Sequence, residues 1–218
     1  MVGKSTVKPL HKLNPQRILY IRQQIEAHFQ CDGLKGKSIL DVGCGGGLVC
    51  EPLARLGAKM SGADADAQAI EVASTHAQGQ GLSISYHNKA IEEIDQKFDV
   101  VLALEIIEHV NDPAAFVQAC AARVKDGGLL ILSTLNRTPH SFLGGIVAAE
   151  YLLRWVPQGT HNWRKFLRPS ELGAMVRASG LEACDVTGLH YNPLDDAFSL
   201  SKDRLKVNYL LSAVKDSR

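Results

Sequence analysis

The 218-residue sequence lacks the features of several large protein classes. It has no run of about 20 apolar residues, the length that a single helix needs to cross a bilayer, and no secretory signal pattern. The formal net charge is +1 with both signs dispersed, which gives no nucleic-acid footprint. Nothing repeats internally. We therefore expect a cytoplasmic protein that does not bind nucleic acid, with one domain over residues 1–218.

Cysteine is scarce and has no recognisable pattern. The five cysteines are odd in number and scattered, and Cys44 and Cys50 are not spaced as metal ligands. Reduced thiols in a cytosolic protein are the natural interpretation.

The most informative segment that is present is a glycine-rich loop. An apolar run ends at Asp41, and four glycines follow within five residues, at 43 and 45–47. A strand, a tight loop and a helix in this order form the nucleotide-binding corner of an open α/β sheet. We expect Asp41, Gly43 and Gly45 to contact the ligand.

The details of this loop select the ligand. A dinucleotide fingerprint needs glycine at position 48, which is Leu48, and the Gly-Lys-Ser/Thr of a phosphate-binding P-loop is missing. A carboxylate at Asp41 would repel a pyrophosphate but favour a cation. The loop resembles motif I of the class I methyltransferases, which implies S-adenosylmethionine, although another α/β protein with a glycine-rich turn stays an alternative.

Asp64 supports this interpretation. It ends a short strand about 20 residues after the glycine loop, where an acid accepts hydrogen bonds from ribose hydroxyls. The neighbouring Asp66 lies past the strand end and is expected to cap the following helix.

Strand and helix patterns alternate along the chain, which predicts a Rossmann-like α/β fold with a mostly parallel sheet of seven strands and helices on both faces. The predicted strands are 38–42, 58–63, 82–87, 98–103, 129–134, 181–189 and 206–214, and the predicted helices are 17–29, 48–56, 67–78, 113–124 and 169–179. Residues 136–167 interrupt the pattern after the fifth strand and are expected to form an inserted helical cap.

A second cluster follows the fourth predicted strand. Glu105, Glu108 and His109 lie where ligand crevices form in such sheets, beyond the carboxyl ends of the strands. Oxygen and nitrogen ligands suit a hard cation such as Mg²⁺. The alternative is a structural or acid/base role without metal, and we expect His109 to act as ligand or base.

Rarer motifs extend the resemblance over nearly the whole chain. The sequence resembles the ubiquinone-biosynthesis O-methyltransferases in segments 8–17, 40–47, 105–109 and 133–137, and further in 156–161, 165–169, 188–193 and 207–209. The segments at 156–161 (Val-Pro-Gln-Gly-Thr-His) and 188–193 (Gly-Leu-His-Tyr-Asn-Pro) are the most specific. The resemblance implies methylation of 2-polyprenyl-6-hydroxyphenol and of 3-demethylubiquinol, and a place in a ubiquinone-biosynthesis protein complex.

The resemblance also implies site residues. It makes Arg17, Gly43, Asp64 and Leu104 contacts of S-adenosylmethionine, with Arg17 on the methionine carboxylate. The family usually has methionine where this chain has Leu104. Its metal dependence points to the same cluster that follows the fourth strand.

The expected reaction is displacement at the sulfonium methyl by a phenolate oxygen. A phenol has a pKa of about 10, so a base or a cation must favour its ionised form. His161 and His190 are alternative bases.

The 136–167 segment fits a polyprenyl substrate. Trp155 and Trp163 would sit at headgroup level, with Arg164, Lys165 and Arg168 facing anionic lipid on the inner face of the membrane. The alternative is a cap that is buried on the domain.

Two other functions stay open. One is a metal-free methyltransferase of the same fold that acts on another small molecule. The other is a non-catalytic lipid-binding assembly subunit, which the absence of the family's aromatic-rich segment before Lys8 keeps open.

Overall fold

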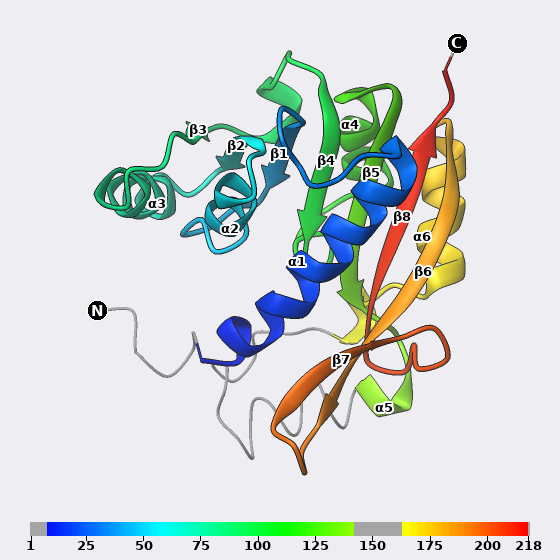
Figure 1. Ribbon diagram of the computed structural model, residues 1–218. Helices are drawn as coiled ribbons and strands as arrows, with labels where there is room; N and C mark the ends of the chain where they lie inside the picture. Colours follow the sequence, from blue (N-terminus) through cyan, green and yellow to red (C-terminus); the bar gives the residue numbers. More distant parts are fainter. Residues whose placement is uncertain (1–7, 142–162, 218) are drawn as a thin grey trace.

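A computed structural model describes residues 8–141 and 163–217, with side chains from residue 12 onward. Its strands form one sheet in the order β3-β2-β1-β4-β5-β8-β6-β7 (Figure 1). The strands are β1 (Ser38–Val42), β2 (Lys59–Asp64), β3 (Ser85–Asn88), β4 (Phe98–Leu104), β5 (Val124–Leu135), β6 (Leu181–Asn192), β7 (Ala197–Ser201) and β8 (Asn208–Lys215).

Strands β1 to β5 pair in parallel, and β8 pairs antiparallel with both β5 and β6. This confirms the predicted Rossmann-like class. The sheet has eight strands instead of the seven predicted, because β6 continues to Asn192 and turns back into β7. In β7, Phe198 and Leu200 pack against the core while their neighbours do not, so even this short segment keeps the two-residue period of a strand.

Helices cover both faces of the sheet. The helices are α1 (Lys8–Phe29), α2 (Cys50–Arg55), α3 (Ala67–Gly79), α4 (Pro113–Ala122), α5 (Pro139–Ser141) and α6 (Pro169–Ala178), with 3₁₀ turns η1 (Ile91–Glu93) and η3 (Trp163–Lys165). Helix α1 begins well before the predicted residue 17 and contains Pro15. It runs obliquely across one face, whereas α4 and α6 lie behind the sheet (Figure 1).

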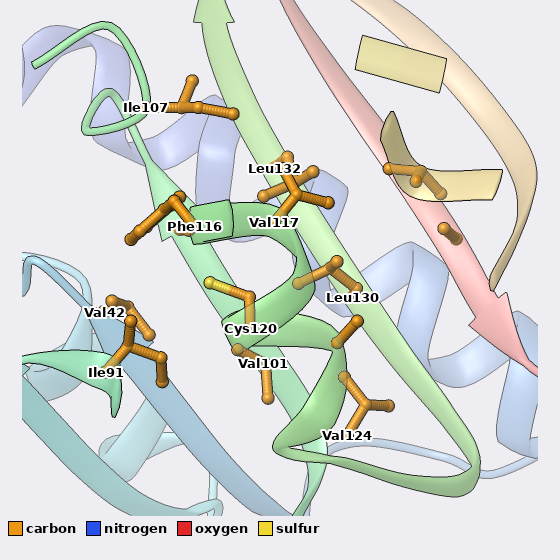
Figure 2. Packing of buried hydrophobic residues seen from close by; sticks show 14 of the residues in the cluster. Val42, Ile91, Val101, Ile107, Phe116, Val117, Cys120, Val124, Leu130 and Leu132 are labelled. Atoms are coloured by element: carbon orange, nitrogen blue, oxygen red, sulfur yellow. The ribbon is translucent and has the colours of Figure 1, made fainter. Parts of the chain in front are cut away.

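The core is divided between the two faces by the alternation of side chains along each central strand. In β4, Val100 and Leu102 pack in the layer under α1 and α2, whereas Val101 and Ala103 pack in the layer under α4 and α6. Phe116, Val117 and Cys120 of α4 enter the second layer in Figure 2. Strands buried on both faces explain why the sequence of β4 is a nearly continuous apolar run.

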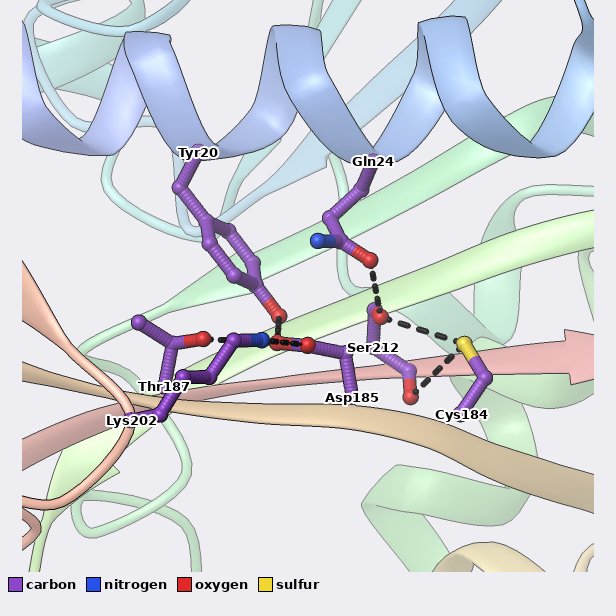
Figure 3. A network of polar contacts seen from close by, with 7 residues as sticks. All are labelled: Tyr20, Gln24, Cys184, Asp185, Thr187, Lys202 and Ser212. Atoms are coloured by element: carbon purple, nitrogen blue, oxygen red, sulfur yellow. Dashed lines mark hydrogen bonds and ion pairs between the residues drawn. The ribbon is translucent and has the colours of Figure 1, made fainter.

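A polar network anchors α1 to β6 and β8 (Figure 3). The Tyr20 hydroxyl donates to Asp185 Oδ1 at 2.8 Å, and the Ser212 hydroxyl donates to Gln24 Oε1 at 2.8 Å. Lys202 forms an ion pair with the same Asp185. These contacts fix the helix that carries Arg17 across the sheet.

The predicted insertion at 136–167 is described only at its ends. Its first residues include α5 and its last residues include η3, while 142–162 lie outside the described residues. Among the helices that are described, none is both long enough and apolar enough to cross a membrane.

Candidate functional site

The predicted cofactor residues meet at one edge of the sheet. β1 lies between β2 and β4 in parallel register. The pairing of β1 with its two neighbours ends at Val42, and the next residues on the three strands are Gly43, Asp64 and Leu104. Each is thus at the carboxyl end of its strand, where open α/β sheets bind ligands.

The glycine loop is tied to the end of β2. Gly43 N donates to Ala63 O at 2.8 Å, and Gly45 N donates to Asp64 Oδ2 at 2.9 Å. Gly43 has a φ of +72°, and a Cβ there would lie 2.2 Å from Ile106 Cδ1. A Cβ at Gly45 would meet nothing within 4 Å, so the loop faces open space at that point.

Asp64, the last residue of β2, and Asp66, two positions later, make different contacts. Asp66 accepts hydrogen bonds from Gln68 N and Ala69 N, which confirms it as the N-cap of α3. Asp64 instead receives Gly45 N on one carboxylate oxygen and Asp66 N on the other, at 2.9 Å each. Each oxygen accepts more than one hydrogen bond, so Asp64 keeps capacity for ligand hydroxyls.

Asp41 is a buried acid beneath the loop. It is 3% exposed, and its burial raises its pKa to about 7, although a contact from Cys50 and the charge of Arg17 oppose the shift. Asp41 therefore repels a pyrophosphate only in its ionised form. A bound cation would favour that form.

Arg17 reaches the site from α1 and meets Glu105 just after β4. Arg17 Nη2 lies 3.3 Å from Glu105 Oε1, and Arg17 is 5% exposed. The same oxygen accepts hydrogen bonds from Ser133 Oγ at 2.8 Å and Asn208 Nδ2 at 2.9 Å. Glu105 has a φ of +54°, which is uncommon for a residue other than glycine. The ion pair and the hydrogen bonds of its side chain thus stabilise the unusual backbone conformation of Glu105.

Sequence reasoning assigned no role to Ser133 and Asn208. Both belong to motifs shared with the resembling family, at 133–137 and 207–209, but neither has a side chain that indicates chemistry by itself. Their function is visible only once β5 and β8 are adjacent.

The three predicted metal ligands do not converge. Glu105 Oε1 already accepts the three contacts described above, and its neighbour Glu108 is 4% exposed, with its pKa raised by burial and by the charge of Glu105. His109 is exposed. Within residues 8–141 and 163–217, no three His, Cys, Asp or Glu side chains are arranged to hold a metal ion. The described residues do not fit a Mg²⁺ site, and that prediction is not supported.

Several buried polar atoms at this edge lack a hydrogen-bond partner within the described structure. They are Arg17 Nε, Glu108 Oε1, Asn136 Oδ1 and Asn208 Oδ1. A buried polar group without a partner is costly, typically about 1–3 kcal/mol. Such a concentration suits a place where a polar ligand supplies the missing partners.

The other predicted bases and membrane residues are only partly described. His190 is half-buried on β6, whereas His161 and Trp155 lie outside the described residues. Trp163 Nε1 donates to Thr138 O at 3.1 Å. That tryptophan is thus partly engaged with the protein itself.

Comparisons with known proteins identify the class. A family model described as a methyltransferase domain matches residues 14–186. A solved magnesium protoporphyrin IX methyltransferase from Synechocystis shares the fold at a TM-score of 0.68 and 17% identity, over 99% of this chain and 89% of that chain. A methyltransferase from Clostridium acetobutylicum also has a TM-score of 0.68, at 13% identity, over 94% and 92% of the chains. Fold and family model together define a methyltransferase domain.

Closer relatives narrow the assignment. A ubiquinone biosynthesis O-methyltransferase of Cereibacter sphaeroides is 48% identical over 95% of this chain and 87% of its own length. One from Dinoroseobacter shibae is 47% identical over the same shares. The chain belongs to the ubiquinone biosynthesis O-methyltransferase family, which confirms the resemblance found in the sequence.

Proposed function

We propose that this protein transfers the methyl group of S-adenosylmethionine to a phenolic or catechol hydroxyl of a polyprenylated ubiquinone precursor. The substrates are 2-polyprenyl-6-hydroxyphenol and 3-demethylubiquinol. The observation that carries the proposal is 48% identity to a ubiquinone biosynthesis O-methyltransferase over 95% of the chain. The edge formed by Gly43, Asp64 and Leu104 supports it.

The cofactor residues have distinct tasks. Asp64 would bind the ribose hydroxyls, Leu104 would contact adenosine, and Arg17 would pair with the methionine carboxylate through its unpartnered Nε. Asp41 and the backbone at Gly45 complete the cradle. When bound, S-adenosylmethionine supplies an electrophilic methyl group on a sulfonium.

The reaction needs an ionised oxygen nucleophile. The phenolate oxygen forms a bond to the methyl carbon while the carbon–sulfur bond breaks, which leaves a methyl ether and S-adenosylhomocysteine. The phenolic proton must go to a base, because a phenol with a pKa near 10 is mostly protonated at neutral pH. His109, exposed beyond β4, is the proposed acceptor, and His190 is the alternative.

Whether the reaction requires Mg²⁺ is decided by the experiment with EDTA below. The described residues offer no three-residue metal group, so no step is assigned to it. A metal that is held mainly by the two catechol oxygens and water would need fewer than three protein ligands.

The protein is also proposed to contact the membrane peripherally, from the cytoplasmic side. Arg164, Lys165 and Arg168 are exposed around η3 and the start of α6, where anionic lipid would attract them. A prenylated substrate must be collected from a membrane. Participation in a ubiquinone-biosynthesis complex is proposed from family membership alone.

Initial rates of methyl transfer to a short-prenyl catechol test the function, first with Mg²⁺ and then with excess EDTA. Methyl transfer in either condition supports the O-methyltransferase. Loss with EDTA and recovery with Mg²⁺ would establish a metal requirement, and unchanged turnover would leave proton removal to a histidine. Absence of turnover on either catechol or phenol, with the cofactor bound, would refute the proposed reaction.

A further inference from the structure

A cavity of about 390 Å³ lies beside the end of β6 and the segment that leads into β8. Its described lining residues are His140, Leu189, His190, Arg204, Lys206 and Val207. Leu189 and His190 belong to the 188–193 motif, one of the most specific in the sequence, to which neither the fold nor the cofactor residues have given a role.

The wall formed by 204–207 is held in place by the loop after β5. Asn136 Nδ2 donates to Leu205 O at 2.6 Å, and Asn136 N donates to Val207 O at 2.8 Å. On the other side, a Cβ at Gly188 would lie 1.9 Å from Arg204 O. Glycine at the head of the motif is therefore required for the two walls to approach.

One residue of the cavity wall is adjacent in sequence to a residue of the cofactor edge. Val207, in its wall, precedes Asn208, whose Nδ2 donates to Glu105 Oε1 at 2.9 Å. The cavity wall and the contact with Glu105, the ion-pair partner of Arg17, are therefore formed by consecutive residues. Both lie at the same end of the sheet, beyond β5 and before β8.

The charged residues that line the cavity are all basic among those described. None of its described lining residues is acidic, and two, Arg204 and Lys206, are basic and exposed. The ion pairs of the described part of the chain include neither Arg204 nor Lys206. By contrast, Lys202, a few residues earlier, is paired with Asp185. These two cations with two histidines favour an anionic ligand, and the apolar Leu189 and Val207 favour one that carries a hydrophobic ring.

We propose, as an inference that rests on the proposed function, that this cavity is the subsite for the anionic ring oxygen of the phenolic substrate. Arg204 and Lys206 supply positive charge to that oxygen, and Leu189 and Val207 form the wall against the ring. The subsite would favour the ionised substrate, which is the nucleophilic form.

Binding of 4-nitrocatechol to the full chain tests the proposal without turnover. The absorption of this probe differs between its neutral and ionised forms, so one titration near pH 7 gives both affinity and ionisation. The wild type is expected to bind the probe and increase its ionised fraction. R204Q/K206Q is expected to bind at least about tenfold more weakly, as for loss of a charge-assisted hydrogen bond.

K59Q/K97Q is the matched control, because it removes the same charge from exposed lysines at the amino-terminal ends of β2 and β4. It should bind as the wild type does. A second probe, 1,2-dimethoxybenzene, has no ionisable oxygen, so its affinity should be the same for R204Q/K206Q and the wild type.

Three results would overturn the subsite. They are unchanged nitrocatechol binding in R204Q/K206Q, an equal loss in K59Q/K97Q, and displacement of the probe by inorganic phosphate at equal or lower concentration, which would indicate a general phosphate site. Because the methyl donor is absent, these outcomes are independent of whether the protein methylates a phenol.

Discussion

Arg17 Nη2 lies 3.3 Å from Glu105 Oε1, and this contact joins the first helix to the loop after β4 across 88 positions of sequence (105 − 17). The guanidinium is 5% exposed, and its Nε has no partner within the described structure. Arg17 is therefore held by protein at Nη2, while its Nε is a buried donor without a partner among the described residues.

The substitution Arg17→Gln is expected to weaken both folding and cofactor binding. Loss of one partner of a buried ion pair costs about 3–5 kcal/mol, and the partial exposure of Glu105 places this case at or below the lower end. The dissociation constant for S-adenosylmethionine should rise at least about tenfold. Urea unfolding and calorimetric titration measure the two effects. Unchanged affinity in a folded variant would remove Arg17 from the cofactor site.

The proposed contact between Asp64 and the ribose can be tested with Asp66 as a matched control. Asp64→Asn is expected to raise the dissociation constant for S-adenosylmethionine about 10- to 100-fold, as for loss of hydrogen bonds to a charged group. Asp66→Asn keeps a good helix-capping residue and should change neither affinity nor stability by more than a few tenths of a kcal/mol. Equal effects of the two variants on affinity would contradict the assignment.

The raised pKa of Asp41 predicts that the free energy of unfolding depends on pH. Its folded pKa is about 7, above the unfolded value of about 3.9. The stabilisation from the protonated form is thus complete below about pH 3.9 and lost as pH rises through about 7. The loss is at most about 4 kcal/mol.

Asp41→Asn should abolish this dependence. The difference in free energy of unfolding between Asp41→Asn and the wild type, measured from pH 5 to 8 without cofactor, should shift in favour of the variant as pH rises. A difference that is flat across this range would show that Asp41 is ionised in the folded protein.

Gly43 and Gly45 should respond differently to alanine. Both have positive φ, which costs an alanine about 1 kcal/mol. Only at Gly43 would the new Cβ also approach a side chain, Ile106, at 2.2 Å. Thermal unfolding should therefore show a larger loss for Gly43→Ala than for Gly45→Ala, and the reverse order would contradict the described loop geometry.

The parts of this protein that sequence predicted well depend on local patterns. Asp66 was identified as a helix cap because it follows a strand end and precedes a helical segment, and the structure confirms it. The central strand that ends at Leu104 was recognisable as a continuous apolar run. Both signals are contained within a few consecutive residues.

What sequence missed depends on contacts between distant segments. Spacing groups Glu105 with Glu108 and His109, but it does not reveal that the Glu105 carboxylate contacts Arg17 and Asn208. The last strands were also harder to predict. β7 was missed because it has only 5 residues, and its alternation depends on Phe198 and Leu200 alone until the pairing with β6 is known.

The most direct test of the account is the identity of the product formed with S-adenosylmethionine that carries a deuterated methyl group. We predict that mass spectrometry will find one trideuteromethyl group on a ring oxygen of a short-prenyl catechol, and that Asp64→Asn will form far less of it at low cofactor concentration. A label on carbon, or binding of the cofactor with no labelled product from any phenol or catechol, would contradict the proposed O-methylation.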